Sequence, residues 1–219
     1  MSAVSGKGDL RGIIDPEGPF LHALGTLGDF MALNLLFILT SLPVVTVGAS
    51  ASALCAAVLR IFRKEDAHIA REYFRDFWKN FWPCLGYTLI FLAVAAGLYV
   101  DVRVMQANSG AFSQLMWIPI GIVALLLALA APYTFAVQAR FSNTFFGTLK
   151  NAVSLSLANL PRSVLIAVLT FLPLGLFLFS TYYFLLTSLF WFLGGFSACA
   201  AGSCALLRGV FARFEQPEG

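Results

Sequence analysis

The feature that most constrains this chain is a run of 45 residues without a charged side chain, from Ser163 to Leu207. An α-helix rises about 1.5 Å per residue and the hydrocarbon core of a bilayer is about 30 Å thick, so one crossing needs roughly 20 apolar residues. As a single helix the run would extend about 67 Å, more than twice that thickness. We therefore expect two crossings joined by a tight turn near Ser180–Phe184, where two tyrosines suit the membrane interface.

The composition agrees with a chain embedded in lipid. Hydrophobic residues make up 59% and charged residues 11% of the 219 residues, whereas soluble domains have about 45–50% and about 25%. A soluble fold needs a charged surface that this chain cannot supply. Two further uncharged runs, Trp82–Val100 and Leu115–Val137, each predict one crossing. Together with the hairpin, they give four crossings.

The N-terminal apolar block leaves two alternatives. Between Asp29 and Arg60 lie 30 uncharged residues, which is long for one crossing and short for two unless the first begins before Asp29. Pro43 removes a backbone donor and clashes with the preceding turn, so it bends or ends a helix. Gly48 can adopt a backbone conformation that other residues avoid. The two residues mark either a bend within one crossing or a turn between two.

The distribution of basic residues favours one of these alternatives. Lys and Arg collect on the cytoplasmic side of membrane proteins. Two crossings in the N-terminal block place 13 basic residues inside and 1 outside, whereas one crossing places 11 inside and 3 outside. Both agree with the rule and the first agrees better. We therefore favour six crossings over five, with both termini cytoplasmic.

The predicted fold class is all-α, a polytopic transmembrane helix bundle with two cytoplasmic amphipathic helices. A flexible N-terminal tail over 1–18 precedes a single transmembrane domain over 19–208, and a C-terminal tail follows over 209–219. The expected crossings are residues 24–42, 47–62, 82–101, 115–137, 163–180 and 184–207. The expected interfacial helices are residues 66–81 and 143–159.

The first interfacial helix is the stronger candidate for a binding surface, because aromatic residues at helical spacing lie beside a basic stripe. The residues that we predict to dock a cytoplasmic partner are Arg71, Phe74, Arg75, Trp78 and Lys79. Helices of this kind anchor a bundle, bind anionic lipid or bind another protein. Four nearby acidic residues partly balance the basic stripe, which weakens an account based on lipid electrostatics alone.

The second interfacial helix has apolar residues spaced four apart, at Phe145, Leu149, Val153 and Leu157. Both interfacial segments end in an asparagine closely followed by a proline, a pattern typical of a helix end. We read the two segments as an approximate repeat, in which a helix on the cytoplasmic face precedes two crossings.

Small residues indicate where helices pack closely. The segments 48–57 and 194–205 are rich in Gly, Ala, Ser and Cys, which allow backbones to approach one another in a membrane. We predict that these two helices pack against each other or against a partner, including a second copy of this chain. The four cysteines lie in apolar stretches without metal-site spacing, so we interpret them as buried free thiols.

Few side chains offer chemistry at membrane depth. Asn34, Thr40 and Thr46 are the intramembrane polar candidates, and they either form helix–helix hydrogen bonds or line a polar pathway. Carboxylates and histidines are missing from the middle of the apolar runs, and nucleotide loops, zinc motifs and nucleophile–base pairs do not occur. We therefore expect no enzymatic activity, no cofactor, no metal and no nucleic-acid partner.

The segment Leu33–Leu54, with the element LPVVTVG over 42–48, and the charged aromatic stretch Phe74–Phe81 resemble the YesL-like family of bacterial membrane proteins. The later segment 139–161 resembles the family's second cytoplasmic segment, so the likeness spans about Phe20 to Arg208. The continuation GASASAL departs from the family pattern, which often has a proline or a bulkier residue there. The family has no established biochemical activity, and its members often lie near genes for carbohydrate uptake. The resemblance implies a multi-pass protein of the bacterial inner membrane, an accessory of ATP-driven sugar import that contacts a sugar permease or its ATPase. The alternative is a stand-alone transporter or channel for a neutral solute.

Overall fold

The computed structural model describes residues 19–63, 68–107, 110–141 and 144–214, and within these ranges the chain forms helices and turns without a strand. Six helical segments are long and apolar enough to cross a bilayer. They are Leu24–Ser41, Val44–Phe62, Ile69–Ala107, Gln114–Arg140, Leu160–Leu178 and Ser188–Gly209. The all-α class and the preferred number of six spanning helices are therefore confirmed.

The N-terminal apolar block folds as two helices, α1 (Pro19–Ser41) and α2 (Val47–Phe62). Between them, Pro43 precedes one turn of 3₁₀ helix over Val44–Thr46. The Thr46 hydroxyl donates to the carbonyl oxygens of Thr40 at 2.6 Å and Pro43 at 2.7 Å, which closes the turn. Pro43 thus marks a reversal of the chain, as the six-crossing alternative required.

The structure requires a glycine at position 48 because a side chain has no room there, and not because of the backbone conformation that the sequence suggests. Gly48 lies in the first turn of α2 with helical neighbours, so its conformational freedom is not used there. A Cβ atom at this position would lie 2.2 Å from Oγ1 of Thr88 and 2.4 Å from Cε1 of Phe135. Gly48 therefore allows the start of α2 to approach the third and fourth spanning helices closely.

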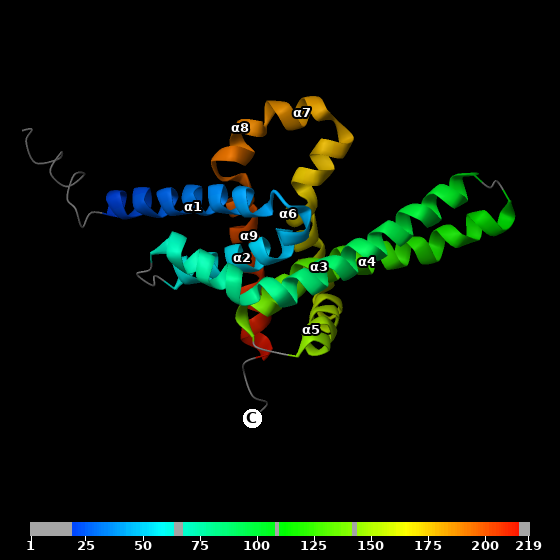
Figure 1. Ribbon diagram of the computed structural model, residues 1–219, viewed down its shortest axis with the longest axis horizontal. Helices are drawn as coiled ribbons and strands as arrows, with labels where there is room; N and C mark the ends of the chain where they lie inside the picture. The colour runs from blue at the N-terminus through cyan, green and yellow to red at the C-terminus, as the bar shows by residue number, and fades with distance from the viewer. Residues whose placement is uncertain (1–18, 64–67, 108–109, 142–143, 215–219) are drawn as a thin grey trace, which may run out of the picture.

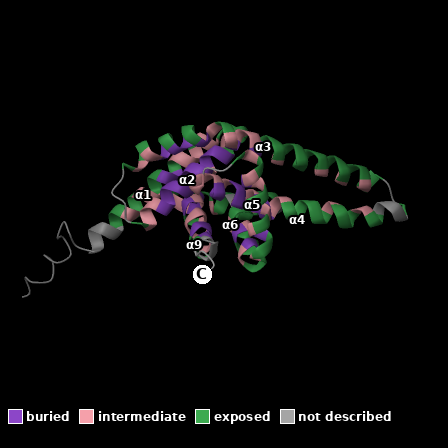
Figure 2. Cartoon of the chain, turned by 90° about the horizontal axis from the view of Figure 1, so that it is seen from below, coloured by how far each residue is buried: buried purple, intermediate pink, exposed green. Residues whose placement is uncertain are grey.

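Helix α2 forms the centre of the molecule. Its residues from Gly48 to Leu59 are buried with one exception, Ala51. In Figure 2 the buried residues gather on and around α2, whereas exposed residues dominate the outer helices. Helix α2 is apolar and has small side chains on all its sides, so it can pack against several neighbouring helices at once.

The first interfacial helix and the third crossing form one continuous helix, α3 (Ile69–Ala107), which corrects the predicted boundary between 66–81 and 82–101. Pro83 lies inside α3 without ending it. The N-terminal part of α3 is held along α2, because the buried Tyr73 donates to the Ser50 carbonyl at 3.5 Å and its hydroxyl lies 2.7 Å from Oγ1 of Thr40. Tertiary packing therefore keeps the helix continuous. Residues 66 and 67 lie outside the described residues.

Helix α4 (Ala111–Arg140) returns along α3, and the two form a hairpin that projects from the rest of the molecule (Figure 1). The outer halves of both helices are mostly exposed (Figure 2). Apolar side chains such as Leu89, Val104 and Ile118 are 50%, 46% and 61% exposed there. In a bilayer this hairpin presents its apolar surface to lipid.

The second interfacial helix is separate, as predicted, and is α5 (Phe145–Ala158). Asn159 breaks the chain with φ −129° and ψ 46°, and α6 (Leu160–Phe179) starts directly after it. Thr144 caps α5 by accepting a hydrogen bond from the Gly147 amide at 3.3 Å. The predicted residue 143 lies outside the described part of the chain.

The end of the chain departs from the expected tight hairpin over 180–184. Helix α6 is followed by α7 (Thr181–Leu186), one turn of α8 (Ser188–Phe190) and a π-helical turn over Trp191–Gly195. The last helix, α9 (Phe196–Phe214), extends beyond the expected end of the crossing at 207 and into the expected tail. The last segment of spanning length begins at Ser188, four residues later than predicted.

The end of α2, the end of α9 and the start of α6 lie on the same side of the molecule. The Arg208 guanidinium near the end of α9 lies 5.6 Å from the ring centre of Phe62, the last residue of α2. Nη1 of Arg162, in the first turn of α6, lies 3.6 Å from the place that a Cβ of Gly209 would occupy. These contacts gather basic residues on one face of the bundle.

Candidate functional site: an ion-paired network and an exposed aromatic face on α3

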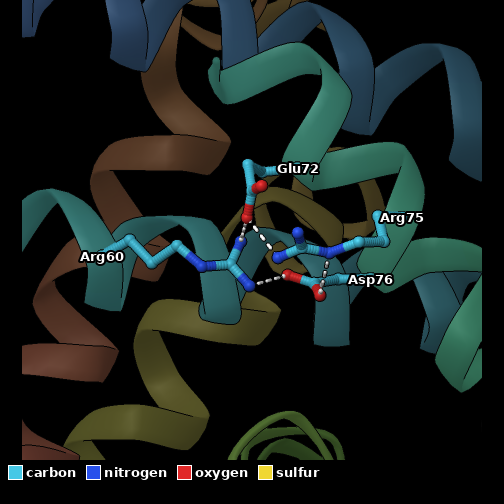
Figure 3. A network of polar contacts seen from close by, with 4 residues as sticks. All are labelled: Arg60, Glu72, Arg75 and Asp76. Atoms are coloured by element: carbon cyan, nitrogen blue, oxygen red, sulfur yellow. Dashed lines mark hydrogen bonds and ion pairs between the residues drawn. The ribbon is translucent and has the colours of Figure 1, made fainter. Parts of the chain in front are cut away.

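The N-terminal part of α3 carries an ion-pair network on its inner side. Arg60 of α2 reaches Glu72 at 3.3 Å and Asp76 at 2.5 Å, and Arg75 contacts the same two carboxylates (Figure 3). The Asp76 side chain is only 9% exposed and that of Arg60 20%. Both acids are thus turned toward Arg60, and the network fixes the start of α3 against the end of α2.

The opposite side of the same segment exposes large aromatic rings. Phe74, Trp78 and Trp82 are 39%, 66% and 76% exposed, and their spacing of four residues puts them on one face of the helix. Adjacent rings of Phe77, Trp78, Phe81 and Trp82 pack with centroids 5.4–5.7 Å apart. The exposed tryptophan rings therefore pack against the neighbouring rings of Phe77 and Phe81.

The predicted docking residues Arg71, Phe74, Arg75, Trp78 and Lys79 are all exposed. We call the surface formed by them and Trp82 the α3 face. Arg75 differs from the others because it also belongs to the ion-pair network. The sequence predicts Trp82 at the start of the next crossing, but its position four residues after Trp78 puts it on this face.

The α3 face has a more positive character than the sequence suggested. Glu72 and Asp76, two of the four acids that were expected to balance the basic stripe, are engaged by Arg60. Among the residues that the structure describes, Arg71 and Lys79 form no ion pair. The surface thus combines exposed aromatic rings with cations that have not been neutralised within the described bundle.

The intramembrane candidate Asn34 is fully buried and binds the backbone of the π-helical turn. Its amide nitrogen donates to the carbonyl oxygens of Trp191 at 2.9 Å and Phe192 at 2.7 Å. Its oxygen accepts from the amides of Phe196 at 3.0 Å and Ser197 at 3.1 Å. Asn34 therefore joins α1 to the irregular start of the last crossing with four hydrogen bonds.

Thr40 and Thr46 are brought together at the turn between α1 and α2. Thr40 donates to the Leu36 carbonyl at 2.8 Å and contacts the Tyr73 hydroxyl, and Thr46 donates to the Thr40 carbonyl. Asn34 is not part of this group, because it binds the backbone of Trp191–Ser197. All three side chains thus have partners within the bundle, and the arrangement supports helix–helix contacts more than a polar pathway.

A second buried polar cluster was not recognised as a group from the sequence. Nε2 of Gln138 in α4 donates to Oδ1 of Asn80 in α3 at 3.2 Å, and Oε1 of Gln138 accepts from Tyr87 at 3.4 Å and from Thr148 of α5 at 3.5 Å. Tyr87 also stacks on Phe145 with ring centroids 4.3 Å apart. This cluster attaches α5 to the α3–α4 hairpin. Residues this far apart in sequence share no local signal.

Metal-binding chemistry has little support in the described part of the chain. No group of three or more His, Cys, Asp or Glu residues there is arranged to hold a metal ion. All four cysteines are free thiols.

The architecture defines a multi-pass helical membrane protein with a cation-bearing aromatic surface at the start of one spanning helix. Residues 30–102 match the model of a family described as a protein of unknown function, DUF624. This segment, about a third of the chain, includes α2, about half of α1, most of α3, the ion-pair network and the α3 face. No curated protein and no solved structure matches the chain.

Proposed function

We propose that this protein is a non-enzymatic accessory component of an ATP-driven transporter for carbohydrates, and that it binds the permease or its ATPase through the α3 face. The observation that carries the proposal is the exposure of Phe74, Trp78 and Trp82 beside Arg71 and Lys79. Aromatic residues and arginine are enriched at the centres of protein–protein contacts. The match to DUF624 covers this part of the chain, and the resemblance to the YesL-like family includes it.

The rigidity of the α3 face supports binding to a protein. The ion pairs of Arg60 with Glu72 and Asp76 hold the inner side of the segment against α2. The contacts of Trp78 with the rings of Phe77 and Phe81 restrain the aromatic side chains. A preorganised surface loses less conformational entropy on association than a mobile one. A helix that only anchors a bundle in headgroups does not need this arrangement.

We infer that the protein lies in the bacterial inner membrane with both termini in the cytoplasm. Six spanning helices form an even number of crossings, so both termini share one side. The gathering of Arg60, Arg162 and Arg208 at one end of the bundle supports the cytoplasmic assignment for that end. A single cysteine added near each terminus tests this assignment, since both should react with an impermeant maleimide only in inverted vesicles.

Co-purification from native membranes tests the function. The full-length protein is extracted in mild detergent, and mass spectrometry quantifies every protein that elutes with it in stoichiometric amount. The double variant Arg71→Glu with Lys79→Glu should lower the yield of a transporter subunit at least tenfold. Arg75 is left unchanged, because its reversal would also disturb the network behind the surface.

The matched control reverses two exposed cations elsewhere, Arg103→Glu on the outer part of α3 and Lys150→Glu on α5. It applies the same change of net charge and should leave the yield of the subunit unchanged. An equal loss in both double variants would show that net charge, not the α3 face, governs association. Elution of the wild-type protein without any transporter subunit would overturn the proposal.

A further inference from the structure

The two small-residue segments pack against each other, and they bring two thiols into contact. Cys55 of α2 and Cys204 of α9 are 149 residues apart in sequence, and their Sγ atoms lie 2.9 Å from each other. Both residues are buried, with 7% and 2% of their surface exposed. From the sequence both are expected to be buried free thiols, and no spacing rule connects them.

The geometry points to a function for this pair, and we propose that Cys55 and Cys204 are a modification site that a small peroxide oxidises to a disulfide bond between α2 and α9. The bond length in a disulfide is about 2.05 Å, so the sulfur atoms need to move together by less than about 1 Å. Small residues in both helices already bring the two backbones close. The bond therefore requires little rearrangement of the bundle.

The burial of the pair selects the kind of oxidant. Glutathione disulfide and similar reagents are large and charged, and they cannot enter a buried helix–helix contact. Hydrogen peroxide is small and uncharged, and it can reach the thiols through the bilayer. Of the two residues, Cys55 is the more exposed, so we assign it as the thiol that reacts first.

The chemistry balances in two steps. The Cys55 thiol gives up its proton and the thiolate sulfur attacks one peroxide oxygen; the O–O bond breaks, the leaving hydroxide takes up the proton as one water molecule, and a sulfenic acid remains on Cys55. The Cys204 thiol then attacks the sulfenic sulfur, the S–O bond breaks, and a second water molecule leaves as the disulfide forms. The two thiols give up two electrons in total, and these electrons reduce the peroxide.

The disulfide bond would link α2 and α9 covalently at the centre of the bundle. Helix α2 carries Arg60, which holds the start of α3, and α9 contacts α2, α6 and α1. A crosslink that closes a loop of this length restricts the unfolded chain strongly. We expect the oxidised protein to melt roughly 5–10 °C higher than the reduced protein.

Peptide mapping of the full-length protein in native membrane vesicles tests the proposal. Vesicles are treated with hydrogen peroxide, free thiols are blocked with N-ethylmaleimide, and the digest is analysed without reducing agent. Most of Cys55 and Cys204 should be recovered as one linked peptide that dithiothreitol separates. The variants Cys84→Ala and Cys199→Ala serve as matched controls and should leave the yield of this peptide unchanged.

A second measurement does not depend on the crosslink. In the Cys204→Ala variant, Cys55 should remain as sulfenic acid and react with dimedone. In the Cys55→Ala variant, tagging of Cys204 should be at least fivefold lower. Recovery of Cys55 and Cys204 as alkylated thiols after peroxide treatment of the wild-type protein would overturn the proposal, and so would their pairing with other cysteines.

Discussion

The four hydrogen bonds of Asn34 predict how much the free energy of unfolding falls when its side-chain amide is removed. Replacing Asn34 by leucine keeps a side chain of similar size but removes both donors and both acceptor contacts. At about 0.6 kcal/mol for each polar contact within a membrane, the loss is about 2.4 kcal/mol. The carbonyls of Trp191 and Phe192 would also lack this partner, and unsatisfied buried groups cost more. We expect the free energy of unfolding to fall by about 2–4 kcal/mol.

The assay is reversible unfolding in mixed micelles by increasing the fraction of SDS. The control on the same helix is Ser41→Ala, because within the described part of the chain the Ser41 hydroxyl bonds only to carbonyls of its own helix, those of Phe37 and Ile38. This control should change the free energy of unfolding by less than about 0.5 kcal/mol. Asn34→Asp should be worse than Asn34→Leu, since a carboxylate would face two carbonyl oxygens that it cannot bond.

Local opening provides an independent readout of the same contact. Amide hydrogen exchange at Phe196 and Ser197 should accelerate in Asn34→Leu, because these two amides lose their acceptor. Exchange in α2 should stay unchanged at the same denaturant concentration. If Asn34→Leu unfolds at the wild-type SDS fraction, the amide does not hold the π-helical turn and our reasoning is wrong.

Two further predictions concern the contacts of α2. Gly48→Ala should lower the free energy of unfolding by about 1–3 kcal/mol, because its Cβ has no room beside the neighbouring helices. Gly97→Ala, where the space is open, should be neutral or slightly stabilising in the same SDS titration. Asp76→Asn should cost about 1–3 kcal/mol because it leaves the partly buried Arg60 with one carboxylate fewer. The double variant Arg60→Met with Asp76→Leu should recover part of that loss, and a fully additive loss would contradict the coupling of the pair.

Local patterns determined where the chain forms spanning helices and where it turns back. Uncharged runs long enough to cross a bilayer correspond to spanning helices in the structure. Pro43 reverses the chain because a helix cannot continue normally through a residue that lacks an amide proton. The segments rich in small residues, 48–57 and 194–205, pack against each other, which was one of the two predicted alternatives. Sγ of Cys55 and Sγ of Cys204 lie 2.9 Å apart, and small side chains allow helices to approach this closely.

The same local signal had different outcomes at two places. An asparagine followed closely by a proline ends a helix at Asn159, where Pro161 lies in the first turn of α6 and its missing amide proton has no cost. The corresponding pair, Asn80 and Pro83, lies within the continuous helix α3. Contacts of α3 with α2 and α4 decide this difference, and they cannot be derived from the segment itself.

The buried face of α5 shows a similar limit. The sequence shows an apolar line through Phe145, Leu149, Val153 and Leu157 but does not say which side of α5 packs against the bundle. The structure buries the small residues Thr148, Ala152 and Ser156 instead, and leaves Leu157 45% exposed. In a membrane an apolar side chain gains little by leaving lipid, so close packing selects the small residues.

The sequence by itself determined that this is an all-α membrane protein with spanning helices of known position, because the bilayer imposes its thickness on every uncharged run. It also predicted the exposed basic and aromatic residues Arg71, Phe74, Arg75, Trp78 and Lys79 of the α3 face, but it assigned Trp82 to the next crossing. Only the tertiary structure decided that Glu72 and Asp76 turn to Arg60, that Asn34 binds the backbone of a distant helix and that Cys55 meets Cys204. These contacts join residues from different helices, and their formation depends on how the helices pack against one another.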